Sequence, residues 1–208
     1  ILGLGHIGAV AGMPVMEGKA VLFDYLVGVS GVPILIENAD PKVIIETVRN
    51  IAPTFGAIKL EDIKAPDCFV VERLCRERMN IPVFHDDQHG TAIVVGAAAK
   101  NALHVAGKNF EDIKIVSTGG GAAGIACLNM LLKLGVKREN VWLCDIQGLV
   151  YEGRTEDMTP QKAEYAQPGG PRQLADVIDG ADLFLGLTSP DRVYAYSDQA
   201  VDVFVSHA

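Results

Sequence analysis

The chain has 208 residues and a formal net charge of -8 at pH 7, with 49% hydrophobic and 21% charged residues. This composition is typical of a globular protein that is long enough for one large domain or two small ones. The acidic balance argues against nucleic acid or an anionic membrane as a partner, because both need a basic face. No apolar stretch is long enough to span a bilayer, so we expect no membrane segment.

The four cysteines form no C-x-x-C pair and lie inside apolar segments, at Cys68, Cys75, Cys127 and Cys144. We therefore expect reduced thiols in the core of a cytoplasmic protein, where disulfides are rare. The sequence starts without a methionine and stops just after a strand-like run, residues 201–205. We expect it to be a fragment of a longer protein.

Apolar runs rich in β-branched residues alternate along the chain with segments of helical period. In the first part, the predicted strands are residues 32–36, 57–60 and 81–84, and the predicted helices are residues 41–51, 66–79 and 91–106. Asp40 at the N-cap and Pro41 at the first helical position mark the start of the first helix. Polar residues 87–90 follow a strand and precede a helix, so we place a domain junction there.

The alternation continues to the end of the chain. The predicted strands are residues 113–117, 141–144 and 183–185, and the predicted helices are residues 122–134 and 172–178. This order predicts an α/β fold, in which helices cover both faces of a parallel sheet through right-handed crossovers. The predicted junction divides the chain into a first part, residues 1–87, and a second part, residues 88–208.

Two segments match the dinucleotide fingerprint G-x-G-x-x-G, namely GLGHIG from Gly3 and GGGAAG from Gly119. The fingerprint has meaning only between a strand and an unbroken helix, with an acidic residue at the end of the next strand. The second copy meets all three conditions, and Asp145 is the acid that can accept the hydroxyls of an adenosine ribose. The predicted cofactor loop, whose backbone N–H groups approach a pyrophosphate, is Gly119, Gly120, Gly121, Ala122, Ala123 and Gly124.

The first copy fails this test. Pro14 is expected to break any helix that follows GLGHIG, because proline has no N–H to donate. The nearest candidate acid, Glu37, lies 29 residues beyond Gly8. We interpret GLGHIG as a tight turn at the end of a strand.

Two acidic pairs follow successive predicted strands, Glu61-Asp62 after residues 57–60 and Asp86-Asp87 after residues 81–84. In a right-handed βαβ unit both pairs reach the carboxyl end of the same sheet, where three or four carboxylates converge. They would repel strongly unless some were protonated or a cation lay among them. Hard oxygen ligands favour Mg²⁺ or Mn²⁺.

Three further side chains allow two interpretations each. Lys19 precedes an apolar helical run in PVMEGKAVLF, and is either a solvated lysine or a general base with a tuned pKa. His85 and His89 flank the second acidic pair, and either support the local turn or orient metal ligands.

Five segments together resemble malic enzymes of the large bacterial, NADP-type branch: PVMEGKAVLF, KLEDIKAP, IPVFHDDQHGTAIVV, STGGGAAGIACLNMLLKLGVKRENVWLCD and YEGRTEDMTPQKAEYAQ. The resemblance implies the oxidation of malate to pyruvate and CO₂, with reduction of NAD(P)⁺ and a divalent metal. It implies a substrate- and metal-binding part over residues 1–87 and a Rossmann-like NAD(P)-binding domain over residues 88–208. It assigns Glu61, Asp62 and Asp87 to the metal. It also assigns Lys19 to the general base and Asp86 to the carboxylate beside that lysine.

The chain departs from this family in two places. The family's general acid is a tyrosine from an N-terminal segment, and no tyrosine here occupies the matching context: Tyr25, Tyr151, Tyr165, Tyr194 and Tyr196. The sequence after residue 187 also differs from the family's substrate and nicotinamide segments. The resemblance therefore implies the metal, base and cofactor parts of a larger site, in a protein that we expect to be a homo-oligomer.

The choice between NAD and NADP stays open. Asp145 favours a free ribose 2′-hydroxyl, and residues 146–148 contain no Arg or Lys to receive a 2′-phosphate, whereas the branch leans toward NADP. Two other functions compete with the malic enzyme interpretation. A metal-independent amino-acid dehydrogenase would leave the acidic pairs unexplained, and a non-catalytic dinucleotide-binding module would have no need of Lys19.

Overall fold

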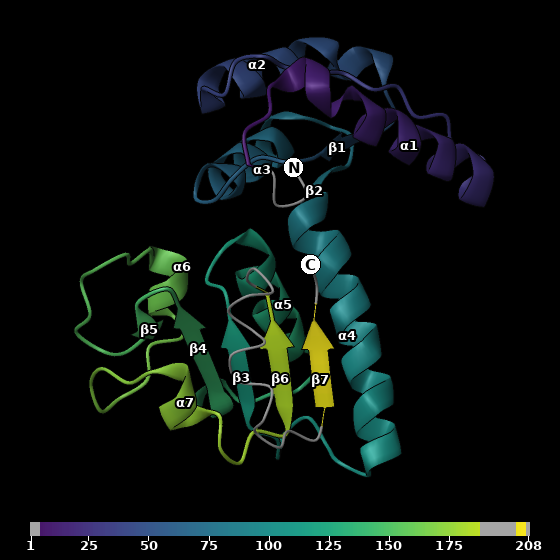
Figure 1. Ribbon diagram of the computed structural model, residues 1–208. Helices are drawn as coiled ribbons and strands as arrows, with labels where there is room; N and C mark the ends of the chain where they lie inside the picture. The colour runs from purple at the N-terminus through teal and green to yellow at the C-terminus, as the bar shows by residue number, and fades with distance from the viewer. Residues whose placement is uncertain (1–4, 188–202, 207–208) are drawn as a thin grey trace. The chain divides into compact units, whose positions relative to one another are not determined.

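The computed structural model describes residues 5–187 and the backbone of residues 203–206. The chain divides into two compact units, one of residues 1–58 and 73–83 and the other of residues 59–72 and 84–208. Figure 1 labels the helices and strands of both units. Among the described residues, no helix is both long enough and apolar enough to cross a membrane.

The first unit is built mainly from helices. It contains α1 (Ala9–Val27), α2 (Pro41–Ile51) and the short 3₁₀ helix η1 (Ala52–Thr54). The predicted start of α2 is confirmed, since the Asp40 side chain accepts a hydrogen bond of 2.8 Å from the backbone N–H of Lys42. The helix buries one face through Ile44, Ile45 and Val48, so its apolar periodicity gives this unit part of its core.

Two predictions for the first unit are wrong. Helix α1 continues through Pro14, which was expected to break it. A proline removes one backbone hydrogen bond, but the residues beyond it keep their own N–H donors, so the helix continues. Residues 32–36 form no strand, and within the described chain no strand pairs with them. Apolar character alone does not form a strand without a partner edge, and Val32 remains 63% exposed.

Strands β1 (Ile58–Leu60) and β2 (Val83–His85) pair in a two-stranded sheet, and α3 (Asp67–Arg78) connects them along the chain. Helix α4 (Asp86–Ala106) begins directly after β2, five residues earlier than predicted. Residues 87–90, which resembled a polar linker, therefore lie inside α4. Asp86 and Asp87 favour this earlier start of α4, because the positive end of the helix dipole stabilises acidic side chains in the first turn.

The second unit contains a five-stranded sheet in the order β5-β4-β3-β6-β7 (Figure 1). Its strands are β3 (Ile115–Thr118), β4 (Val141–Asp145), β5 (Gly148–Leu149), β6 (Leu183–Gly186) and β7 (Val203–Ser206). The predicted parallel pairing is confirmed for β3 with β4, β3 with β6 and β6 with β7. The edge strand β5 was not predicted and is antiparallel to β4, because the two residues between them are too few for a crossover.

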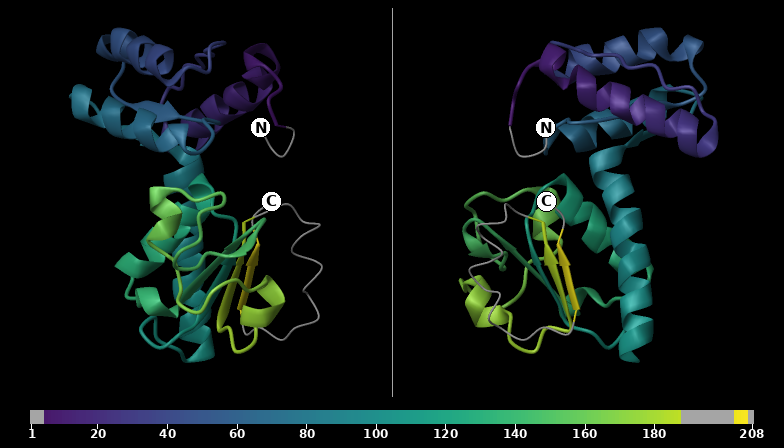
Figure 2. Two further views of the ribbon diagram at one scale, coloured as in Figure 1. Left: turned by 90° about the vertical axis from the view of Figure 1, so that its left-hand side faces the viewer. Right: turned by 45° about the vertical axis from the view of Figure 1, so that its right-hand side comes forward.

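Both faces of this sheet are covered, as expected. The second unit also contains α5 (Ala122–Lys133), η2 (Arg138–Asn140), α6 (Pro160–Ala163) and α7 (Leu174–Val177). Figure 2 shows α7, in yellow-green, on the opposite side of the sheet from α4, in teal. Successive strand residues point to opposite faces, so Ile115 packs with the core under α4 and α5 while Val116 packs with the core under α7.

Leu128 on α5 is fully buried in the core between that helix and the sheet. We expect Leu128→Ala to lower the free energy of unfolding by about 2–5 kcal/mol, because the substitution leaves a cavity that the sheet cannot fill. Denaturant unfolding followed by circular dichroism measures this loss. Val94→Ala on α4 is the control, since Val94 is 69% exposed and its truncation should change stability by no more than about 0.5 kcal/mol. Equal losses in the two variants would contradict this placement of the core.

Candidate metal and cofactor sites

Three carboxylates converge at the ends of β1 and β2. Glu61, Asp62 and Asp87 each offer one oxygen atom, and these atoms all lie within 4.8 Å of one another. Glu61 and Asp62 directly follow β1, while Asp87 lies in the first turn of α4, immediately after β2. Three of the four carboxylates in the two acidic pairs therefore converge, and Asp86 lies outside this group.

Asp87 lies at the centre of this acidic cluster. Its Oδ2 accepts a hydrogen bond of 2.9 Å from the backbone N–H of Asp62, whose φ of 55° is in the left-handed region. Aspartate tolerates that conformation better than most residues. Burial, followed by the negative charge of Glu61, raises the pKa of Asp87 from 3.8 to about 6. A divalent cation would relieve this repulsion, and three carboxylate oxygens are a donor set that suits Mg²⁺ or Mn²⁺.

Asp86 has a different environment from Asp87, the residue beside it. Its Oδ2 lies 3.1 Å from Nζ of Lys59, and the same ammonium group also pairs with Glu61 Oε2. The Lys59 side chain is only 17% exposed. A Cβ at position 90 would collide with Asp86 Oδ1, so Gly90 leaves the room that this carboxylate occupies.

A group of polar side chains, most of them buried, lies next to Asp87. His85 is fully buried, and its Nε2 lies 3.3 Å from Asp87 Oδ2 without the geometry of a hydrogen bond. Glu72 accepts a 3.0 Å hydrogen bond from the backbone N–H of His85, and His89 Nε2 lies 2.6 Å from the same carboxylate oxygen. Burial lowers the pKa of His85, which favours the neutral ring. His85 therefore contacts Asp87, a member of the acidic cluster, and His89 contacts Glu72, which also binds the backbone of His85.

The second glycine fingerprint has the local geometry that it needs. Gly119 directly follows β3 and has a φ of 103°, which a residue with a side chain rarely adopts. A Cβ on Gly124 would collide with the carbonyl oxygen of Gly119, so this glycine allows α5 to approach the strand. A Cβ on Gly121 would meet nothing within 4 Å, which leaves open space beside the first N–H groups of α5. A phosphate can approach the backbone in such a space.

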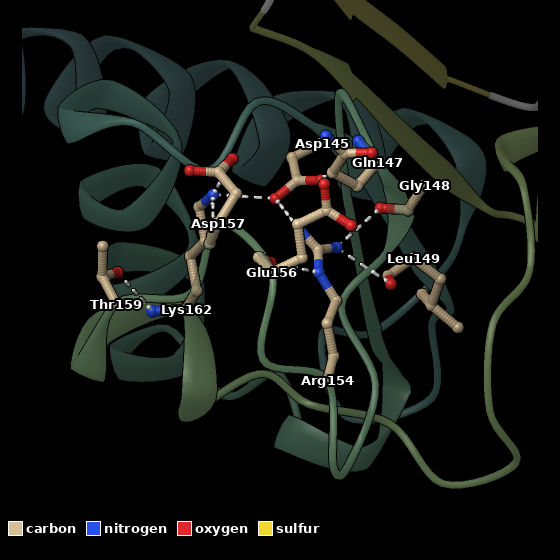
Figure 3. Close-up of polar contacts among 9 residues, drawn as sticks. All are labelled: Asp145, Gln147, Gly148, Leu149, Arg154, Glu156, Asp157, Thr159 and Lys162. Carbon is tan, nitrogen blue, oxygen red and sulfur yellow. Dashed lines mark hydrogen bonds and ion pairs between the residues drawn. The ribbon is translucent and has the colours of Figure 1, made fainter.

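Asp145, the acid expected to bind ribose, is held by two cations that sequence reasoning missed (Figure 3). Its Oδ2 lies 2.6 Å from Arg154 and 2.8 Å from Lys162, and its Oδ1 accepts a hydrogen bond of 2.9 Å from the N–H of Gln147. Burial alone would raise the pKa of Asp145, but the hydrogen bonds from Arg154 and Lys162 outweigh it and hold that pKa below its ordinary value. Lys162 also pairs with Asp157 at 2.8 Å.

A cavity of about 390 Å³ connects the glycine loop to this charged network. Its lining includes Gly119, Gly120 and Gly121 together with Asp145 and Lys162, whose side chain lies against Gly120. Pro66 and Phe69 add an apolar wall. A pocket that combines apolar walls with a few charged groups is typical of a site for a small molecule or cofactor.

The first fingerprint is placed differently. The N–H of Ala9, at the start of α1, donates a hydrogen bond of 3.3 Å to Glu37 Oε2. The chain's own carboxylate therefore lies where a bound pyrophosphate would meet the helix. Residues 1–4, which precede the turn, lie outside the described residues. Lys19 is half-buried in the middle of α1, in the first compact unit.

The sequence contained a signal for only some of the missed side chains. Lys59 and Glu61 are two residues apart in an extended segment, so their side chains leave the same side of the chain. This spacing predicts their contact. Arg154 and Lys162 are 9 and 17 residues beyond Asp145, and no local pattern connects them to it. Those two contacts depend on the path of the chain after β5.

Two family models match the sequence. One, described as the NAD binding domain of malic enzyme, matches residues 88–193, and the other, described as the N-terminal domain of malic enzyme, matches residues 1–44. The first match covers the five-stranded sheet up to β6, together with the glycine loop and Asp145.

Named relatives support the same family. The chain is 54% identical to an NADP-dependent malic enzyme of Haemophilus influenzae over 91% of its own length and 25% of that protein. It is 56% identical to an NAD-dependent malic enzyme of Rhizobium meliloti over 91% of its own length and 24% of that protein. The chain thus spans about a quarter of the length of these curated relatives.

A solved structure has a similar fold. The crystal structure of an NAD-dependent malic enzyme from Thermotoga maritima superposes with a TM-score of 0.85 at 42% sequence identity. The alignment covers 91% of this chain and 51% of that one. Sequence and fold therefore point to one family.

The raised pKa of Asp87 predicts a stability effect that depends on pH. The folded chain holds the Asp87 proton more tightly than the unfolded chain does, so stability without metal decreases as pH rises from about 4 to about 6. Asparagine keeps an oxygen for the N–H of Asp62 but cannot ionise. In EDTA at pH 8 we expect Asp87→Asn to have a higher Tm than the wild type, and this gain should disappear near pH 4. Calorimetric melts at both pH values test this, and an equal gain at both would contradict it.

Proposed function

Because the chain belongs to the malic enzyme family, we propose that it carries the metal- and dinucleotide-binding parts of an enzyme that oxidises malate to pyruvate and CO₂. The observation that carries this proposal is the convergence of Glu61, Asp62 and Asp87. Neither a metal-independent amino-acid dehydrogenase nor a non-catalytic dinucleotide module accounts for three carboxylates held so close together. NAD(P)⁺ is the proposed oxidant.

In this proposal, Glu61, Asp62 and Asp87 hold Mg²⁺ or Mn²⁺. When bound, the metal would polarise the C2 oxygen of malate and take up negative charge as CO₂ leaves. The protein's contribution is to keep three hard ligands in place. The hydrogen bond from the N–H of Asp62 orients Asp87, and Glu61 directly follows β1. The Asp87 environment, which raises the pKa of the free carboxyl, favours occupation by a cation.

Lys19 is the proposed general base, which takes the proton from the C2 hydroxyl of malate. Its support is its position in PVMEGKAVLF, a segment that resembles the family. Asp86 is proposed as the carboxylate that adjusts the charge beside this base. Its pairing with Lys59 supports a role in charge balance, because Asp86 is already engaged with an ammonium group in the structure.

The dinucleotide is proposed to bind with its pyrophosphate at the loop Gly119–Gly124 and its adenosine ribose beside Asp145. When bound, its nicotinamide would accept the hydride from C2 of malate. Open space at Gly121 and the adjoining cavity support this orientation. Lys162 adds a positive charge beside Asp145, where an NADP 2′-phosphate could pair with it, and this compensates for the lack of cations in residues 146–148.

We also propose that the active protein is a cytoplasmic homo-oligomer. The exposed apolar side chains of α1 support a protein-covered surface, among them Val21, Leu22, Tyr25 and Leu26. The cysteines support a reducing compartment, because all four are free and buried, as predicted.

The catalytic proposal is tested by NAD(P)H formation from malate, with each cofactor and with Mn²⁺ or EDTA. We expect turnover only with the metal. Lys19→Ala should lower kcat by about 10²–10⁴-fold, the usual contribution of a general base. Lys42→Ala on α2 is the matched control and should keep wild-type activity, because Lys42 is exposed. Turnover in EDTA, or a Lys19→Ala variant as active as the control, would contradict the proposed mechanism.

The role of Lys162 predicts a change in cofactor preference. We expect Lys162→Gln to weaken NADP⁺ binding by about 1.5–3 kcal/mol, the usual contribution of a hydrogen bond to a charged group. NAD⁺ binding should change much less, because NAD⁺ has no 2′-phosphate to pair with. Fluorescence titration of Lys162→Gln with NADP⁺ and with NAD⁺ measures both affinities, and NAD⁺ binding is the control for NADP⁺ binding. Equal weakening of the two cofactors would show that Lys162 acts only by supporting Asp145.

A further inference from the structure

Lys59 is a cation built into the acidic cluster. Its ammonium group pairs with Glu61 Oε2 and lies 3.1 Å from Asp86 Oδ2. The side chains of Lys59 and Glu61 are 17% and 10% exposed, so water screens this contact less than it would on an open surface. Neither the family matches nor the proposed reaction gives this lysine a role.

Glu61 would therefore have two competing positive partners with a metal bound. It belongs to the three carboxylates whose oxygens lie within 4.8 Å of one another, and it also accepts the Lys59 ammonium. A divalent cation bound by these carboxylates would meet a fixed positive charge that contacts one of its own ligands. Asp86 lies outside the three-carboxylate group and can keep Lys59 when Glu61 turns to the metal.

We propose that Lys59 acts as an internal counter-ion that competes with the divalent metal for Glu61 and so weakens metal binding. The proposal rests on the metal site proposed above. Without metal, Lys59 neutralises part of the charge of Glu61 and Asp86 and keeps the two strand ends together. With metal, the repulsion between the ammonium and the divalent cation lowers the affinity. Even at the dielectric constant of water, a singly and a doubly charged cation sharing one carboxylate repel by an amount worth about tenfold in affinity.

Two other roles for Lys59 give different results. If the lysine orients Glu61 for the metal, removal of its charge weakens metal binding. If it forms a purely structural ion pair, removal of its charge changes stability and leaves the metal affinity as it was. Only competition for Glu61 predicts tighter binding after the charge is lost.

The experiment is a calorimetric titration of Mn²⁺ into the metal-free 208-residue chain, with Lys59→Gln, Lys59→Met and Lys100→Gln beside the wild type. Lys59→Met keeps most of the length of the side chain without its charge. Lys100→Gln makes the same change in net charge on α4, at an exposed position about 20 Å along the helix from Asp86. We expect both Lys59 variants to bind Mn²⁺ about tenfold more tightly than the wild type, and Lys100→Gln to match the wild type.

Equal or weaker Mn²⁺ binding by the Lys59 variants would overturn the proposal. Thermal melts give a second measure, since the Lys59 variants should have a lower Tm than the wild type in EDTA and gain more from Mn²⁺. An uncharged variant could be unfolded without metal, and the competition model then requires Mn²⁺ to fold that variant. A variant that stays unfolded at a Mn²⁺ concentration that saturates the wild type would also overturn the proposal. If neither the wild type nor any variant binds Mn²⁺, the metal site itself is refuted. If the Lys59 variants bind Mn²⁺ with the wild-type affinity, only the competition proposal is refuted.

Discussion

Repulsion among carboxylates is the constraint on which the account of this chain depends. Glu61, Asp62 and Asp87 lie close enough for their oxygens to share one ligand, and such closeness is unfavourable unless positive charge or a proton offsets it. Two responses are visible in the structure. The pKa of Asp87 is raised to about 6, and the Lys59 ammonium lies between Glu61 and Asp86. A divalent cation is the third response, and it is the one that the proposed chemistry uses.

Charge also organises the proposed cofactor site of the second unit, but there two cations balance two carboxylates, since Lys162 pairs with Asp157 as well as Asp145. One carboxylate, Asp145, is surrounded by the guanidinium of Arg154 and the ammonium of Lys162, and both its oxygens have partners. The glycine loop supplies backbone N–H groups at the start of α5, and Lys162 supplies a positive charge beside that loop. A negatively charged dinucleotide is the ligand that such a combination suits.

Sequence patterns predicted most of the second unit because α4 and α5 are long helices and β3, β4 and β6 are apolar runs between turn residues. The two acidic pairs were recognisable because they follow consecutive strands. The errors arose where one residue type was given too much weight. Pro14 was expected to end a helix that continues, and the apolar residues 32–36 were assigned to a strand that has no partner edge in the described chain. Lys59 was detectable from its spacing to Glu61. Arg154 and Lys162 were not, because only the three-dimensional path of the loop brings them to Asp145.

The central claim is that the carboxylates at the ends of β1 and β2 form a divalent metal site. The most direct measurement is an anomalous difference map from a crystal of the chain grown with Mn²⁺, recorded near the manganese absorption edge. The account predicts one strong peak contacted by carboxylate oxygens of Glu61, Asp62 and Asp87, with Lys59 turned toward Asp86. A map without a peak among these residues, at Mn²⁺ concentrations that support turnover, would contradict it.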